Sequence, residues 1–127
     1  MARILVVDDE QDVVRVVVKL MTMHGHEVRT AADGFEALEK VVAERPDVII
    51  LDLALPTMDG FEVCRRLKSD EATRSIPIVM MTAAYVSMDD ARLGEQSGAD
   101  EYVVKPFLRE VLIHNVERLL HRANAAG

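Results

Sequence analysis

Polar groups that could act on a phosphoryl group follow four short apolar runs of this 127-residue chain. In chain order these groups are Asp8 with Asp9, Asp52, Thr82 and Lys105. If the four runs are neighbouring parallel strands, their carboxyl ends meet at one edge of the sheet, where open α/β sheets bind ligands. Three carboxylates, a hydroxyl and an ammonium would then lie together. Such an edge could hold a divalent cation and a phosphoryl group.

The acidic residues favour a hard metal ion. Three carboxylates that lie close together raise one another's pKa unless a cation intervenes. Oxygen ligands fit Mg²⁺ best, with Mn²⁺ as the alternative, at Asp8, Asp9 and Asp52. A backbone carbonyl after Asp52 and several waters would complete the shell. Lys105 could pair with Asp52 in an empty site and with a phosphoryl oxygen in an occupied one, and Thr82 offers a hydroxyl donor to the same oxygens.

The apolar runs have the lengths and compositions of β-strands. We predict strands at residues 3–7, 27–30, 47–51, 76–82 and 100–104. All but the second lack polar alternation, which is typical of strands covered by helices on both faces. The connections between them are long enough for one helix each. This alternation of strand and helix predicts a parallel sheet of βαβ units.

The first connection is ambiguous from its composition. Residues 13–18 are rich in β-branched side chains, which favour strands. A crossover between parallel strands needs a long connection, however, and Leu20, Met21 and then Gly25 extend the run to helical length with a plausible stop. We therefore predict a helix there. Apolar residues recur at helical spacing in three later stretches, at residues 35–42, 61–67 and 111–120.

Composition restricts the class of protein. The length suits one domain with one core. A net charge of −7 argues against binding to nucleic acid by this domain, because phosphate backbones repel such a surface. No apolar stretch approaches the length of a membrane span, and the single cysteine, Cys64, allows no intrachain disulfide, so we expect a soluble, cytoplasmic protein that does not enter a membrane.

Taken together, these motifs resemble the receiver domain of two-component response regulators. The resemblance covers essentially the whole chain. The motifs are Asp8-Asp9, Asp52-Leu53-Ala54-Leu55-Pro56, Met58-Asp59-Gly60, Thr82-Ala83 and Lys105-Pro106-Phe107, in this order and at these spacings. Each of them is a weak signal alone, but the combination is highly specific.

The resemblance implies a fold and a domain organisation. The fold would be α/β, with a doubly wound five-stranded parallel sheet in the order 2-1-3-4-5 and helices on both faces. The receiver domain would span residues 1–122, and residues 123–127 would be a flexible end or the start of a linker. The peptide bond between Lys105 and Pro106 would be cis.

The resemblance also implies roles for the acidic residues. Asp52 would be the phosphoacceptor. Asp9, together with Asp8 directly or through water, would hold Mg²⁺ with the Asp52 carboxylate and the Ala54 carbonyl. Such a domain catalyses only its own phosphorylation and dephosphorylation, so we do not expect an enzyme with turnover of external substrates.

Other residues would sense the phosphoryl group. The resemblance implies that Lys105, Thr82 and the Ala83 backbone N–H bind its oxygens, and that Tyr102 is an aromatic switch that turns inward when Thr82 moves. Phosphorylation would then change the face formed by strand 100–104 and by predicted helices at residues 87–97 and 108–121.

The resemblance implies protein partners for both steps. A histidine kinase or a phosphotransfer protein would be the donor. A phosphatase or a downstream output protein would dock on the changed face, and phosphorylation could drive dimerisation through it.

Other readings compete with this one. Asp8 and Asp9 could form a solvated turn or cap the next helix, Asp59 suits the cap of a helix starting at Phe61, and Tyr102 could be a core aromatic. A small Mg²⁺-dependent phosphohydrolase with an aspartyl-phosphate intermediate would need similar groups. Those enzymes usually carry a second aspartate two residues after the nucleophile, where this chain has Ala54. A third possibility is a receiver-like interaction module that never takes phosphate.

Overall fold

The computed structural model of the chain describes residues 2–83 and 98–126. The elements of the described residues follow one another in the order β1 (Arg3–Val7), α1 (Gln11–Met23), β2 (Glu27–Ala31), α2 (Gly34–Ala43), β3 (Val48–Asp52), α3 (Gly60–Ser69), β4 (Ile78–Ala83), β5 (Glu101–Lys105) and α5 (Arg109–Ala126). The predicted helix at residues 87–97 lies outside the described residues. Among those described, no helix is both long and apolar enough to cross a bilayer.

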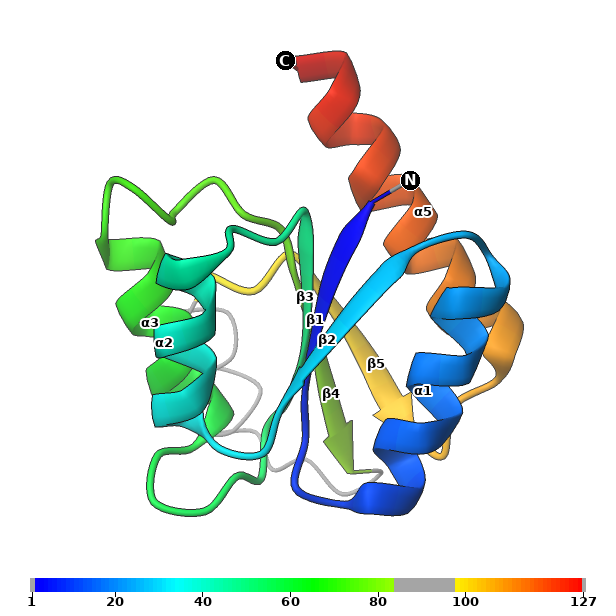
Figure 1. Cartoon of the computed structure of the whole chain (residues 1–127), viewed down its shortest axis with the longest axis horizontal. Coiled ribbons are helices and arrows are strands. Elements are labelled where there is room, and N and C mark those ends of the chain that lie inside the picture. Colours follow the sequence, from blue (N-terminus) through cyan, green and yellow to red (C-terminus); the bar gives the residue numbers. More distant parts are fainter. Residues whose placement is uncertain (1, 84–97, 127) are drawn as a thin grey trace.

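All five strands run parallel in one sheet, in the order β2-β1-β3-β4-β5. This confirms the predicted doubly wound arrangement. The chain winds outward from β1 to β2, then crosses to β3 and continues to β5, so the winding direction switches between β1 and β3. Parallel strands end at the same edge, and this edge lies at the bottom of Figure 1. Ligands of such sheets bind beyond that edge, near the switch point.

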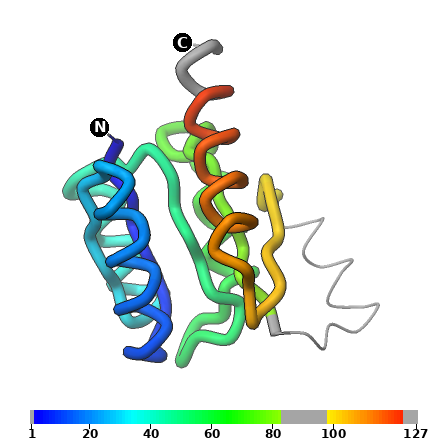
Figure 2. Tube along the Cα trace, turned by 90° about the vertical axis from the view of Figure 1, so that its right-hand side faces the viewer, coloured from blue at the N-terminus to red at the C-terminus, as the bar shows by residue number. Residues whose placement is uncertain are grey.

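Helices cover both faces of the sheet, with α2 and α3 on one face and α1 and α5 on the other (Figure 1). Each face has its own apolar cluster, since successive strand residues point to opposite sides. In β1, Leu5 and Val7 pack toward α2 and α3, whereas Ile4 and Val6 pack toward α1 and α5. Figure 2 shows α1 and α5 on the face turned to the viewer, with β5 at one side of the sheet. Strands β1, β3 and β4 are thus buried on both faces, as predicted, whereas β5 is not, since Tyr102 is 40% and Val104 51% exposed.

The ambiguous first connection is helix α1, as predicted. Its β-branched residues are tolerated because Val17, Leu20 and Met21 are buried against the sheet, and this packing outweighs the weak local strand preference. The predicted stop is also confirmed. Gly25 has φ of 86° just after the helix, and the N–H groups of Gly25 and His26 donate to Thr22 O and Met21 O at 3.0 and 3.2 Å. This is a Schellman motif, which needs a left-handed residue at that position.

Several element bounds differ by a residue or two from the prediction. Strands β3, β4 and β5 each extend at least one residue further toward their carboxyl ends than predicted, so Asp52 and Lys105 are the last residues of their strands. Helix α3 begins at Gly60, one residue earlier than predicted, with Asp59 as its cap. Helix α5 continues to Ala126, so residues 123–126 extend this helix. The assignment of residues 123–127 to a flexible end or linker stays a prediction.

Candidate functional site

Two buried carboxylates lie at the carboxyl edge of the two central strands. Asp52 ends β3 opposite Met81 and is 3% exposed, and Asp8 directly follows β1 and is 1% exposed. The backbone fixes both. The Asp8 N–H donates to Ala31 O at 3.1 Å, and Leu53, just after Asp52, donates its N–H to Met81 O at 2.9 Å. Both side chains therefore start from a rigid, hydrogen-bonded sheet edge.

Lys105 lies between these carboxylates. Its Nζ is 3.0 Å from Asp8 Oδ2 and 3.0 Å from Asp52 Oδ1, and 3.7 Å from Glu10 Oε1. The predicted pairing with Asp52 is confirmed, and Asp8 shares the same ammonium. The Lys105–Pro106 bond is cis, as the resemblance implied. One cation thus links the ends of β1, β3 and β5.

The pKa values of both charged partners are shifted. Burial raises the pKa of Asp52 above its usual value, and the charges of Asp8 and Asp9 act in the same direction, while the hydrogen bond from Lys105 opposes them. Burial alone would lower the pKa of Lys105, but its hydrogen bonds to Asp8 and Asp52 and the attraction of both carboxylates raise it above its usual value. Lys105 therefore stays protonated. Its positive charge partly offsets the rise in the pKa of Asp52 that burial causes.

A third carboxylate belongs to this group. One oxygen each from Asp8, Glu10 and Asp52 lie within 4.8 Å of one another. Three oxygen donors of this kind suit a hard divalent cation such as Mg²⁺. Asp9, the other predicted ligand, is exposed, yet it lies near enough to raise the pKa of Asp52. Sequence reasoning missed Glu10, although its place directly after the acidic pair was a signal that could have identified it.

The loop after β3 folds tightly behind Asp52. The Gly60 N–H donates to Leu53 O at 2.8 Å, and a Cβ at Gly60 would lie only 2.4 Å from the Asp52 carbonyl oxygen. Real Cβ atoms essentially never approach backbone so closely, so only glycine fits here. Asp59 caps α3 by accepting from the Glu62 N–H at 2.9 Å, which confirms its predicted structural role. The exposed Ala54 lies within this loop.

The predicted phosphate sensors lie on β4 and β5. Thr82 is 5% exposed and pairs with Val104, and Ala83 pairs with Lys105, so both lie at the same edge as Asp52. Tyr102 is 40% exposed and pairs with Met80. Since Met80 and Thr82 are two residues apart, Thr82 and Tyr102 share one face of the sheet. The structure brings the predicted switch residues onto the same face, with Tyr102 in an outward position.

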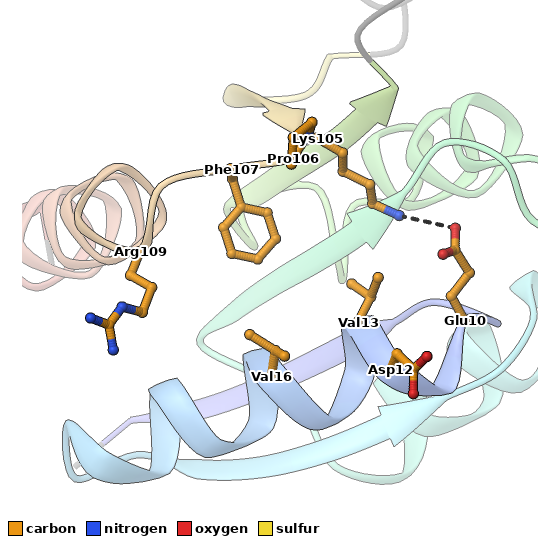
Figure 3. Close-up of a pocket in the computed structure, with 8 residues that line it drawn as sticks. All are labelled: Glu10, Asp12, Val13, Val16, Lys105, Pro106, Phe107 and Arg109. Atoms are coloured by element: carbon orange, nitrogen blue, oxygen red, sulfur yellow. Dashed lines mark ion pairs between the residues drawn. The ribbon is translucent and has the colours of Figure 1, made fainter.

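A cleft of about 580 Å³ opens beside the charged groups (Figure 3). The start of α1 forms one wall with Glu10, Val13 and Val16, and Lys105 and Phe107 from the link between β5 and α5 form part of the other. The cleft is mainly apolar, with the ammonium of Lys105 and the carboxylate of Glu10 facing each other at one end. Of the charged site, Glu10 and Lys105 thus border this cleft, whereas Asp8 and Asp52 do not line it.

Comparison with known proteins identifies relatives of this chain by sequence and by fold. The sequence model of the response regulator receiver domain matches residues 4–117. The chain is 42% identical over 124 residues to the DNA-binding dual master transcriptional regulator RpaA of Synechocystis sp., and 41% identical over 125 residues to the alkaline phosphatase synthesis transcriptional regulatory protein PhoP of Bacillus subtilis. Each match covers 98% of this chain and 51% of the relative, so the chain spans about half their length.

A solved structure agrees over the whole chain. The CheY-like response regulator receiver domain protein of Methanospirillum hungatei superposes with a TM-score of 0.92 at 27% sequence identity. The match covers 100% of this chain and 99% of the other. The five-stranded sheet and its flanking helices are therefore those of a receiver domain.

Proposed function

This chain belongs to the response regulator receiver domain family, and we propose that it accepts a phosphoryl group on Asp52 from a histidine kinase or a phosphotransfer protein. One observation carries the proposal: the ammonium of Lys105 lies 3.0 Å from both Asp8 and Asp52 at the carboxyl edge of the sheet. A buried carboxylate that is kept anionic beside a cation is suited to attack phosphorus and to hold the product.

The transfer follows from the positions of the side chains. An Asp52 carboxylate oxygen forms the new bond to phosphorus while the bond from phosphorus to the donor's imidazole nitrogen breaks, and the imidazole leaves. Lys105 is placed to move from its carboxylate partners to the new phosphoryl oxygens. Thr82 and the Ala83 N–H, on the neighbouring strand end, would donate to the same group.

The donor atoms at this site fit Mg²⁺, or Mn²⁺ in its place. Asp8 and Asp52 are buried and preoriented as ligands, while the exposed Asp9 and the Ala54 carbonyl are proposed to complete the set. Bound there, the ion would neutralise charge on the phosphoryl group during transfer. Before the transfer, Lys105 holds Asp52 in place by contacting both it and Asp8 at 3.0 Å.

The conformational change would extend from the site along β4 and β5. If Lys105 and Thr82 turn toward the phosphoryl group, Tyr102, which lies on the same face of the sheet as Thr82, would turn inward toward the place that Thr82 leaves. A change from an exposed to a buried ring would alter the surface read by an output protein or a phosphatase, or by a second copy of the domain. A cytoplasmic location belongs to the same proposal.

The phosphohydrolase alternative is not favoured. The family that matches is a receiver domain of response regulators, which is a signalling domain, and PhoP is named as a regulatory protein. Ala54 has no side chain that could act as a general acid two residues after Asp52. The relatives RpaA and PhoP are named as transcriptional regulators, so by likeness we propose that this domain controls an output activity of that kind.

Intact-mass measurement after incubation with acetyl phosphate and Mg²⁺ tests the proposal. The wild-type chain should gain one phosphoryl group and Asp52→Asn should gain none. Asp59→Asn is the matched control, because it alters a nearby exposed carboxylate and leaves a side chain that still caps α3. If the wild type gains no mass, or if Asp52→Asn gains as much, the assignment of Asp52 is wrong.

A further inference from the structure

Glu10 occupies an unusual place for a glutamate. It is the N-cap residue of α1, with φ of −83° and ψ of 106°, yet its side chain makes no capping hydrogen bond. Aspartate, asparagine, serine and threonine are the side chains that serve this position well. In Figure 3 the Glu10 carboxylate turns away from the helix and toward Lys105, at the end of the cleft. The side chain therefore contributes to the charged site and not to the helix end.

The position of Lys105 shows where a cation would be attracted. Its ammonium lies 3.0 Å from Asp8 and Asp52 and 3.7 Å from Glu10, so one positive charge already gathers all three carboxylates. One carboxylate oxygen from each of the three residues lies within 4.8 Å of the other two. Asp8 and Asp52 are buried and fixed by the sheet, whereas the Glu10 side chain is 65% exposed and free to adjust its reach.

We propose that Glu10 is a further carboxylate of the divalent-cation site, beside Asp8, Asp9 and Asp52, and raises its affinity for Mg²⁺. This inference rests on the proposed function, because it concerns the same site. Glu10 adds a negative charge at the solvent side of the ion, while Asp8 and Asp52 hold the ion from the protein side. The long glutamate side chain reaches from the start of α1 to the charged site. A shorter side chain at this position would cap the helix instead.

The size of the effect follows from exposure. A carboxylate that lies about 5 Å from a divalent cation, screened as in water, changes the binding constant by roughly tenfold before salt is added. Because Glu10 is more than half exposed, ions in the buffer reduce this further. Replacing Glu10 with glutamine should therefore lower the Mg²⁺ affinity by about three- to tenfold at low ionic strength, and by less as salt increases.

Titration calorimetry with Mg²⁺ alone, without phosphoryl donor, measures this affinity. The variants are Glu10→Gln and Asp12→Asn, which remove the same charge from the same end of α1. Asp12 is the matched control, since its side chain is 95% exposed and its carboxylate pairs with Arg15 at 2.7 Å. We expect Glu10→Gln to bind Mg²⁺ more weakly than Asp12→Asn by at least about threefold. If the two variants bind Mg²⁺ equally, Glu10 is not part of the cation site.

Two further measurements separate the possible failures. The difference between the two variants should shrink when NaCl is raised from about 0.02 M to about 0.3 M, and a difference that does not change with salt contradicts an electrostatic role. Phosphorylation of the wild type by acetyl phosphate, followed by mass, tests the proposed function alone. Equal Mg²⁺ binding by the variants in a chain that is phosphorylated would overturn only the role of Glu10.

Discussion

Replacing Lys105 with methionine tests how the empty site is held together. Asp8 and Asp52 have side chains that are 0% and 5% exposed, and Lys105 is the cation that both contact. Methionine keeps the apolar stem of the lysine and removes only its charge. Two carboxylates would then face each other at a buried sheet edge with the cation between them gone, which is unfavourable.

The magnitude can be worked out from burial. Removing one partner of a buried ion pair costs about 3 to 5 kcal/mol. The lower end applies here, because Lys105 is 17% exposed and water can enter from the cleft. With an unfolding entropy of about 2.1 cal/mol/K per residue, a chain of 127 residues loses about 11 °C in Tm for a cost of about 3 kcal/mol.

Thermal unfolding in the presence of a chelator measures this effect. Lys19→Met, which removes an exposed lysine on α1, is the matched control and should melt within a few degrees of the wild type. Mg²⁺ should then stabilise Lys105→Met more than the wild type, because the ion no longer competes with an ammonium. At about 100 times its Kd, the ion adds about 2.7 kcal/mol. A Lys105→Met chain that melts like the wild type in chelator would refute this account of the site.

Three other predictions concern neighbouring features. Gly60→Ala should lower the free energy of unfolding by about 2 kcal/mol or more, because its Cβ would lie 2.4 Å from the Asp52 carbonyl oxygen. It should also slow phosphorylation by acetyl phosphate. Gly25→Ala is the control: it has open space for its Cβ and only the strain of a positive φ, so it should leave phosphorylation unchanged. Asp52→Asn should be more stable than the wild type at neutral pH. The pKa of Asp52 is raised above 3.8, so its protonation favours the folded state, and this contribution is complete below pH 3.8 and lost as the pH rises through the folded-state pKa. Chemical denaturation across this pH range should show the gap between the two chains closing as the pH falls. Glu10→Ser should raise the free energy of unfolding by about 0.5 to 1 kcal/mol, because serine can cap α1, and it should weaken Mg²⁺ binding. A variant that is more stable and also binds Mg²⁺ more tightly would contradict the proposed role of Glu10.

The strand ends illustrate how far the sequence reaches. Apolar runs without polar alternation predicted the buried parallel strands, because such strands must be covered on both faces. The sequence placed Asp52 and Lys105 just beyond their strands, whereas both are the last paired residues. Hydrogen bonding of a strand continues as long as its neighbour offers a partner, and Ala83 on β4 provides one opposite Lys105. The register between strands that decides this is not encoded locally.

The site was predicted less completely than the fold. Residue type and spacing identified Asp8, Asp52 and Lys105, since strand ends in this topology must converge. They did not reveal that Lys105 contacts both carboxylates at 3.0 Å, nor that a carboxylate oxygen of Glu10 lies within 4.8 Å of those of Asp8 and Asp52. Those contacts depend on the direction in which each side chain points from the turn after β1. In this turn the Glu10 N–H donates to Asp8 Oδ1 at 2.9 Å, which holds Asp8 inward.

The contacts of Lys105 explain how one small change at Asp52 can affect the far side of the sheet. In the resting state a single ammonium satisfies carboxylates from β1 and β3, so β5 is tied to both central strands through one charge. On the proposed function, a phosphoryl group on Asp52 would add oxygens that compete for this ammonium, and a divalent cation would balance the charge at Asp8. Lys105 can then follow the phosphoryl group without leaving a buried carboxylate unpaired. The strand that carries Lys105 also carries Tyr102, three residues earlier, so the proposed shift of Lys105 would reach an exposed side chain through the same strand.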